Sequence, residues 1–200
     1  VSPILNPLLY RWHRETIKFT LDSIGRTEMD EGPEFIFAHI LCPHPPFVFS
    51  SDGTPEKIRR VYSTQDASHF MAEGSVGEYR EGYREQITYL QQQIIEMVDE
   101  IQQDPDRKII ILQGDHGAGM QLDHESLANT NIRERAGILN AIYFPDQEYD
   151  MMYPGISPVN TFRLVFTQYL GIEMPLLPDK HYFSPYTELL DLTQVDDLLE

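Results

Sequence analysis

The chain has a single cysteine, Cys42, among its 200 residues. One cysteine excludes an internal disulfide and a cysteine-rich metal cluster, although it does not identify the cellular compartment. No stretch approaches the roughly 18 apolar residues of a membrane-spanning helix, and no segment has the pattern of a signal peptide. Basic residues are also scarce, with 15 Lys and Arg against 32 Asp and Glu and a net charge of −17. This balance disfavours a nucleic-acid-binding module and a general anionic-membrane surface.

The remaining composition is typical of a soluble globular protein, with 41% hydrophobic and 24% charged residues. A chain of this length buries one good core, so we expect a single domain over residues 1–200. Within it we expect a helical lead-in at residues 1–33, a core at 34–186 and a tail at 187–200. Because the first residue is Val1 and not Met, we expect the chain to be part of a longer protein.

The most informative stretch is KIIILQGDHG, residues 108–117. Its apolar run predicts a buried strand that ends in a polar loop. Ligand and catalytic groups of α/β proteins collect just past the carboxyl ends of strands, where Asp115 and His116 fall. A carboxylate beside an imidazole suits a divalent ion, and the flanking Gly114 and Gly117 permit a positive φ or a close approach to a ligand. A strand-ending turn with a solvated histidine explains these residues equally well.

A second apolar run, FIFAHIL at residues 35–41, is rich in aromatic and branched side chains and predicts another buried strand. It leads into CPHPPF at residues 42–47, which we call the proline segment. Three prolines restrict the backbone around His44, and such a stiff segment can present a substrate-binding histidine. Local sequence alone favours the alternative, in which His44 is merely exposed on a proline-rich connection.

Helical spacing of apolar residues predicts three helices, at residues 4–25, 75–103 and 157–171. The second begins with Ser75 and Glu78, which have the spacing of a capping box. Residues 50–77 are expected to form an irregular polar loop. A third strand is predicted at residues 137–144, and its polar Asn140 either touches a site or bonds a neighbouring loop.

Taken in order, these motifs resemble the C-terminal part of the alkaline phosphatase and sulfatase superfamily. The resemblance rests on FAHILCPHPPF, the long helix, IIILQGDHG, DHE at 123–125, GILNAIYF at 137–144 and SPVNTFR at 157–163. Each motif alone is weak, and their order makes the resemblance specific. The most similar branch contains sulfatase-like membrane proteins related to lipoteichoic acid synthases and phosphoethanolamine transferases. The implied fold is α/β, a partial alkaline phosphatase-like sandwich with a mostly parallel sheet flanked by helices.

The resemblance also implies roles for single residues. Asp115 and His116 correspond to metal ligands, for zinc or manganese first and magnesium or calcium as alternatives. His44 corresponds to the histidine that contacts the phosphate or sulfate group of the substrate, and His124 to a later substrate-binding histidine. The family takes its nucleophile, a threonine, serine or formylglycine, and a further acidic ligand from its N-terminal half. Nothing before His44 supplies them, so no catalytic nucleophile is assigned.

The predicted function is therefore a metal-dependent hydrolase or transferase acting on phosphate or sulfate esters, with lipid- or glycan-linked esters as candidates. This chain is expected to hold half of the site and to be inactive alone. The resemblance implies membrane segments before Val1 and a location on the extracytoplasmic face of a bacterial membrane, with this fragment itself soluble. The alternative is a non-catalytic extracytoplasmic binding or interaction domain of the same fold, with His44 and His116 kept for packing.

Overall fold

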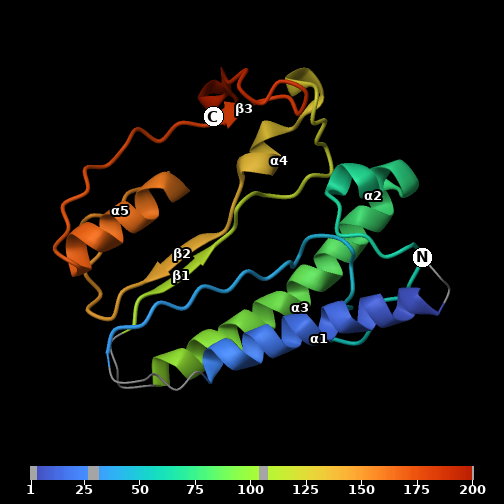
Figure 1. Cartoon of the computed structure of the whole chain (residues 1–200), viewed down its shortest axis with the longest axis horizontal. Coiled ribbons are helices and arrows are strands. Elements are labelled where there is room, and N and C mark those ends of the chain that lie inside the picture. The colour runs from blue at the N-terminus through green and yellow to red at the C-terminus, as the bar shows by residue number, and fades with distance from the viewer. Residues whose placement is uncertain (1–3, 27–31, 104–107, 200) are drawn as a thin grey trace. The chain divides into compact units, whose positions relative to one another are not determined.

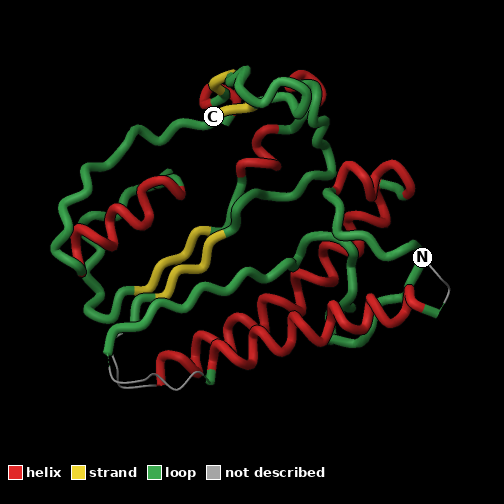
Figure 2. The backbone as a smooth tube through the Cα atoms, viewed as in Figure 1, coloured by secondary structure: helices red, strands yellow, loops and turns green. Residues whose placement is uncertain are grey.

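The structure is a computed structural model that describes residues 4–26, 32–103 and 108–199 (Figure 1). The chain divides into two compact units, unit 1 at Val1–Asp106 and unit 2 at Arg107–Glu200. The helices of unit 1 are α1 (Leu5–Gly25), α2 (Ala67–Glu73) and α3 (Val76–Gln103). The elements of unit 2 are β1 (Ile110–Gln113), η1 (Leu127–Asn129), α4 (Ile132–Ala136), β2 (Asn140–Tyr143), α5 (Pro158–Tyr169), β3 (Tyr182–Phe183), β4 (Thr193–Gln194) and η2 (Asp196–Leu198). Figure 2 shows that long loops join the short helices and strands of unit 2.

Unit 1 is built on α1 and α3, which lie side by side (Figure 1). The buried residues of α1 recur at steps of three and four and so form one face, which consists of Tyr10, His13, Ile17 and Leu21. Pro7 lies in the first turn, where a proline disturbs no hydrogen bond within the helix. The predicted lead-in helix, which ends near Gly25, is confirmed.

The long helix α3 begins with the predicted capping box. The Glu78 N–H donates to Ser75 Oγ at 3.3 Å, and the Ser75 N–H donates to Glu78 Oε2 at 3.1 Å. The loop prediction for residues 50–77 is wrong in part, because α2 lies inside that range. Asp66 explains the difference, since its carboxylate accepts the Ala67 N–H and so caps α2.

The predicted strand at residues 35–41 is absent, although the structure describes all seven of these residues. Phe35, Ile36 and Phe37 are 74%, 46% and 78% exposed. Side chains of this kind favour a strand only when a hydrogen-bonded neighbour and a covering layer are present. Within the described residues this segment pairs with no strand, so its composition alone misled the prediction.

The sheets of unit 2 are small and antiparallel. β1 pairs with β2, Ile110 lying opposite Tyr143 and Gln113 opposite Asn140, and β3 pairs with β4. The α/β class is thus confirmed, but the mostly parallel sheet is not found among the described residues. The Gly114 N–H donates to Leu139 O at 2.9 Å, which extends the antiparallel pairing by one residue beyond Gln113 and Asn140.

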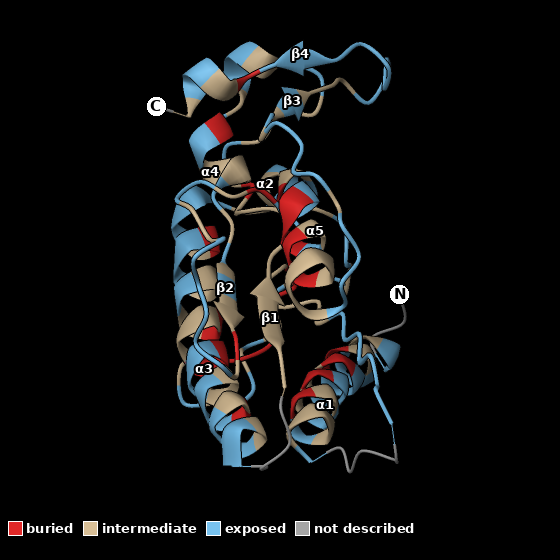
Figure 3. Cartoon of the chain, turned by 90° about the vertical axis from the view of Figure 1, so that its left-hand side faces the viewer, coloured by how far each residue is buried: buried red, intermediate tan, exposed pale blue. Residues whose placement is uncertain are grey.

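The core of unit 2 lies where α5 packs against this strand pair, and its buried residues are Phe144, Leu164 and Val165 (Figure 3). Helical spacing of apolar residues predicted α5, but not all of these residues face the core, because Val159 and Phe162 are 46% and 38% exposed. The buried face carries Asn160, Thr161, Leu164 and Val165. Polar residues are tolerated there because they are bonded: Gln113 Nε2 donates to Thr161 Oγ1 at 2.8 Å.

Candidate active site

Asp115 and His116 directly follow β1 and lie together. Asp115 Oδ1 accepts the His116 N–H at 2.9 Å, and the Asp115 side chain is 78% exposed. His116 Nε2 lies 3.6 Å from Asp115 Oδ2. The structure therefore places an oxygen donor and a nitrogen donor beside each other, with the carboxylate open to solvent.

Gly117 allows the loop after His116 to approach α4. Its N–H donates to Arg135 O at 2.7 Å, and a Cβ at this position would stand 2.1 Å from Glu134 O and 2.6 Å from Gly137 O. Gly117 thus permits a close approach to backbone, whereas the close approach to a ligand stays a prediction. A Cβ at Gly114 would make only ordinary contacts, at 3.6 Å and beyond.

Glu134, which sequence reasoning missed, fixes the next part of the loop. Its carboxylate accepts the N–H groups of Met120 at 3.2 Å and Gln121 at 3.1 Å. Asn131 Oδ1 accepts the Glu134 N–H at 3.2 Å and so caps α4. The sequence did contain a signal, because an asparagine three residues before a glutamate is typical of a helix start.

The position of the His116 ring proton depends on which of two neighbours it serves. His116 Nδ1 lies 2.9 Å from Arg135 Nη1 and 2.8 Å from Gly117 O. A guanidinium only donates and a carbonyl only accepts, so one nitrogen satisfies one of these contacts at a time. Donation to Gly117 O leaves the lone pair on Nε2, beside Asp115, which is the tautomer that a metal at Nε2 requires.

The donors of this pair fit a divalent ion. Ligands of one zinc ion each lie about 2.1 Å from it, so two of them stand roughly 3 to 4 Å apart. The 3.6 Å between Asp115 Oδ2 and His116 Nε2 falls in that range. Among the residues that the structure describes, however, no group of three or more His, Cys, Asp or Glu could hold a metal ion. The pair would supply two ligands, and a complete zinc site takes more.

His124 lies in the same unit, on a loop fixed by its own polar contacts. Its ring stacks on Tyr186 with centroids 4.0 Å apart, and the Tyr186 N–H donates to His124 O at 3.1 Å. The neighbouring Asp123 accepts from Asn129 Nδ2 at 3.0 Å, and this hydrogen bond contributes most to lowering the pKa of Asp123. His124 is therefore ordered by the C-terminal segment.

His44 belongs to unit 1, where buried residues follow it directly, from Pro45 to Phe49. Its Nδ1 contacts Pro45 O, and because a carbonyl only accepts, Nδ1 carries the proton. The side chain that anchors this segment, Gln86 of α3, was not predicted. Gln86 is fully buried, a polar residue among the apolar positions of the helix.

A cavity of about 330 Å³ lies beside Pro45, Pro46 and Phe47 in unit 1. Charged side chains of both signs line it, among them Arg60, which donates to Glu78 Oε2 at 2.8 Å. His69, for which the sequence suggested no role, also lines the cavity. The predicted substrate-binding segment is thus next to a space of the size that a small organic group occupies.

A family model described as Sulfatase matches residues 3–163, which is most of the chain. The chain belongs to the sulfatase family. Membership indicates a hydrolase or transferase of sulfate or phosphate esters, in a family that generally depends on divalent metals. No curated protein and no solved structure matches this chain. Among the residues that the structure describes, no helix combines the length and hydrophobicity needed to cross a membrane.

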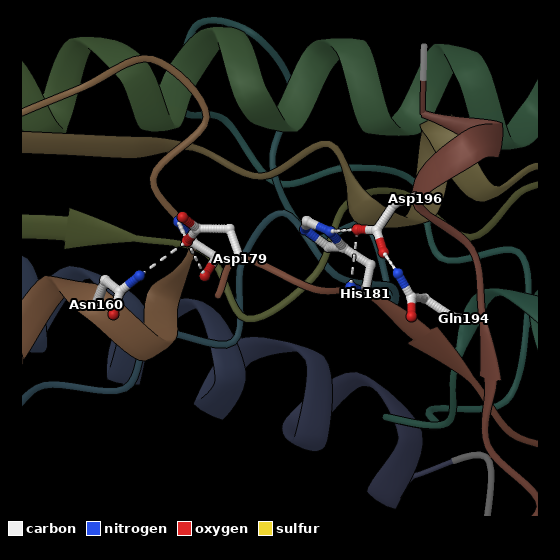
Figure 4. A network of polar contacts seen from close by, with 6 residues as sticks. Asn160, Asp179, His181, Gln194 and Asp196 are labelled. Atoms are coloured by element: carbon white, nitrogen blue, oxygen red, sulfur yellow. Dashed lines mark hydrogen bonds and ion pairs between the residues drawn. The ribbon is translucent and has the colours of Figure 1, made fainter. Parts of the chain in front are cut away.

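Two other carboxylates of unit 2 have structural partners (Figure 4). Partial burial alone would raise the pKa of Asp179, but hydrogen bonds from Ser157, Tyr153 and Asn160 outweigh it and lower the pKa to about 2. Asp196 accepts from His181 Nδ1 at 3.0 Å, the bond that contributes most to lowering its pKa. Both carboxylates hold the C-terminal segment in place.

Asn140, for which the sequence left two roles open, forms hydrogen bonds with its neighbours. Its Oδ1 accepts from Gln113 Nε2 at 3.1 Å, and its Nδ2 donates to Ile156 O at 3.3 Å. These bonds tie β2 to β1 and to the loop before α5. Asn140 therefore supports the end of β1 from which Asp115 and His116 extend.

Proposed function

We propose that this protein is a metal-dependent hydrolase or transferase of phosphate or sulfate esters, in which Asp115 and His116 hold a divalent ion. The observation that carries the proposal is the 3.6 Å separation of Asp115 Oδ2 and His116 Nε2, with Gly117 O beside His116 Nδ1. A carboxylate with an imidazole suits zinc or manganese, and magnesium or calcium are the alternatives.

The chain's own residues have separate roles in this proposal. A bound divalent ion would activate the nucleophile and stabilise negative charge on the transferred group. The Gly117 carbonyl orients the His116 ring by accepting from Nδ1. His44 and His124 bind oxygens of the transferred group or donate a proton to it, and for His44 the exchanging nitrogen is Nε2, because Nδ1 faces Pro45 O. The nucleophile remains unassigned.

We further propose that the protein belongs to the branch related to lipoteichoic acid synthases and phosphoethanolamine transferases. The order of motifs from His44 to Arg163 supports this assignment. It implies lipid- or glycan-linked esters as substrates. It also implies attachment to a membrane through segments before Val1 and a location on the extracytoplasmic face.

Calorimetric titration with zinc and manganese tests the metal pair. We expect micromolar or weaker binding, because two ligands hold an ion less tightly than four. Asp115→Asn should abolish it, whereas Asp150→Asn, which removes the same charge from another exposed carboxylate, should not. Unchanged affinity in Asp115→Asn would exclude the carboxylate as a ligand, and no binding in the parent would contradict a preformed pair.

One observation favours a second function, a non-catalytic binding or interaction domain of the same fold. Within the described ranges no three metal-ligating side chains are grouped. In that case Asp115→Asn and His116→Asn should lower the unfolding free energy without changing metal affinity. The same titration, combined with urea unfolding of each variant, therefore separates the two functions.

A further inference from the structure

We propose that Gln86 of α3 is a positioning residue for His44, an inference that rests on the substrate-binding role proposed for this histidine. The proline segment has few backbone hydrogen-bond donors of its own, since residues 43, 45 and 46 are prolines without an N–H. Residues 45–49 are nevertheless buried, and buried backbone groups need partners. The support must therefore come from another element.

Gln86 supplies that support from both ends of its amide. Its Oε1 accepts the Val48 N–H at 2.7 Å, and its Nε2 donates to His44 O at 3.2 Å. Gln86 and Val48 are both 0% exposed, so water does not compete for the Val48 N–H. A single side chain thus fixes the backbone on either side of Pro45, Pro46 and Phe47.

Gly82, one turn before Gln86 on the same face of α3, makes room for the segment. A Cβ at Gly82 would stand 2.2 Å from Phe47 Cδ2. The Phe47 ring fills this space and packs edge-on against Phe70 and Tyr79, each at 5.3 Å between centroids. The missing Cβ and the buried amide together determine where the proline segment lies on α3.

The position of the backbone is transmitted to the imidazole of His44 by a short path. His44 Nδ1 donates to the carbonyl of the next residue, Pro45, while the carbonyl of His44 itself accepts from Gln86. If Gln86 loses its amide, the His44 carbonyl and the Val48 N–H, which flank the Pro45 carbonyl in the chain, are released. The ring then loses the contact that fixes its protonated nitrogen, and Nε2 is no longer presented in one direction.

Two substitutions in the full 200-residue chain test this proposal. Gln86→Leu removes both hydrogen bonds. In Gln86→Glu, the protonated carboxyl keeps one acceptor and one donor in the shape of the amide, whereas the ionised form only accepts and repels His44 O. Burial favours the protonated form of the introduced carboxyl. We therefore expect it to change from the protonated form, which resembles the amide, to the ionised form, which does not, between about pH 5 and pH 8. Gln91→Leu, an exposed change on the same helix, is the matched control.

The readout is the slowly exchanging Nδ1–H proton of His44 in the NMR spectrum, with the buried His13 of the same unit as a reporter of folding. We expect the parent and Gln91→Leu to show the His44 signal at both pH values. Gln86→Leu should lose it at both, and Gln86→Glu should keep it at pH 5 and lose it at pH 8. Retention of the signal in both Gln86 variants at pH 8 would overturn the proposal.

Two further outcomes are also decisive. If Gln86→Leu unfolds and so loses the His13 signal, the spectra of Gln86→Glu at the two pH values test the proposal instead. A Gln86→Glu variant that is unfolded at both pH values overturns the proposal. Titration of the parent with inorganic sulfate and phosphate separately tests the role of His44, because its ring signals should shift. An unresponsive His44 with a Gln86-dependent Nδ1–H signal would reject the substrate role while leaving the positioning intact.

Discussion

Unit 1 holds the loop around His44 through buried contacts, whereas unit 2 holds the loop around His116 through hydrogen bonds near solvent. In unit 1 the residues after His44 are buried and one fully buried side chain, Gln86, bonds their backbone. In unit 2 the Glu134 carboxylate and the backbone of α4 hold the loop, and Asp115 stays 78% exposed. A loop fixed through its backbone leaves its side chains available, which suits a ligand pair that other ligands must complete.

Gly117→Ala should destabilise unit 2 alone and give the largest change in unfolding free energy. The added methyl group meets three backbone carbonyls, of which that of Glu134 is 2.1 Å away, and backbone cannot yield as a side chain can. We expect a loss of about 3 kcal/mol in the unfolding free energy of unit 2. Amide hydrogen exchange in β1 and β2 measures it.

Gly114→Ala is the matched control, because its methyl group meets nothing closer than 3.6 Å. It should leave the exchange rates of both units within a factor of a few of the parent. If Gly114→Ala and Gly117→Ala lower the unfolding free energy of unit 2 equally, the loop requires backbone freedom from its glycines and not the close approach to α4.

Local signals explain what could be predicted from the sequence. Ser75 with Glu78 predicted the start of α3, and the run after Lys108 predicted β1, because caps and apolar runs act within a few residues. The predicted burial of β1 is wrong, because its four residues are only partly buried. The adjacency of Asp115 and His116 needed no tertiary information. The metal role of this pair and the substrate roles of His44 and His124 stay predictions.

What sequence reasoning missed depends on contacts between distant residues. Gln86 and Glu134 resembled ordinary polar helix residues until the structure showed the backbone groups that they bond. The run at 35–41 has strand composition but no hydrogen-bonded neighbour, and the buried face of α5 follows the partners of Asn160 and Thr161. Neither a neighbour nor a partner can be inferred from spacing along the chain.

Acid should weaken unit 2 through Asp179. Its pKa of about 2 in the folded state lies below the ordinary value, so the ionised form stabilises the fold above about pH 5. This stability is lost as the pH falls from about 5 to 2, because the unfolded chain takes up the proton first. Relative to Asp179→Asn, the parent should be roughly 2 kcal/mol more stable at pH 7 and nearly equal at pH 2.

Urea unfolding at both pH values measures this difference, and the comparison with the variant cancels other titrating groups. The variant also offers an internal check, since Tyr153, Ser157 and Asn160, which bond Asp179, all belong to unit 2. The amide exchange of unit 1 should be the same in parent and variant at each pH. A gap between parent and variant that persists at pH 2 would mean that packing of the side chain, and not its charge, stabilises the segment.

Gly82→Ala should lower the unfolding free energy of unit 1 alone. Its net effect should be the smallest of the three, because two contributions oppose each other. Alanine is favoured over glycine inside a helix by about 1 kcal/mol, but the methyl group would stand 2.2 Å from Phe47 and must displace a packed ring, at a cost of about 1 to 3 kcal/mol. Gly77→Ala, with nothing nearer than 4.0 Å, shows the helical gain alone. Amide exchange in α3 should therefore quicken in the first variant and slow in the second. If exchange slows equally in both variants, Phe47 moves without loss, and the contrast fails between the buried contacts that hold the His44 loop and the hydrogen bonds near solvent that hold the His116 loop.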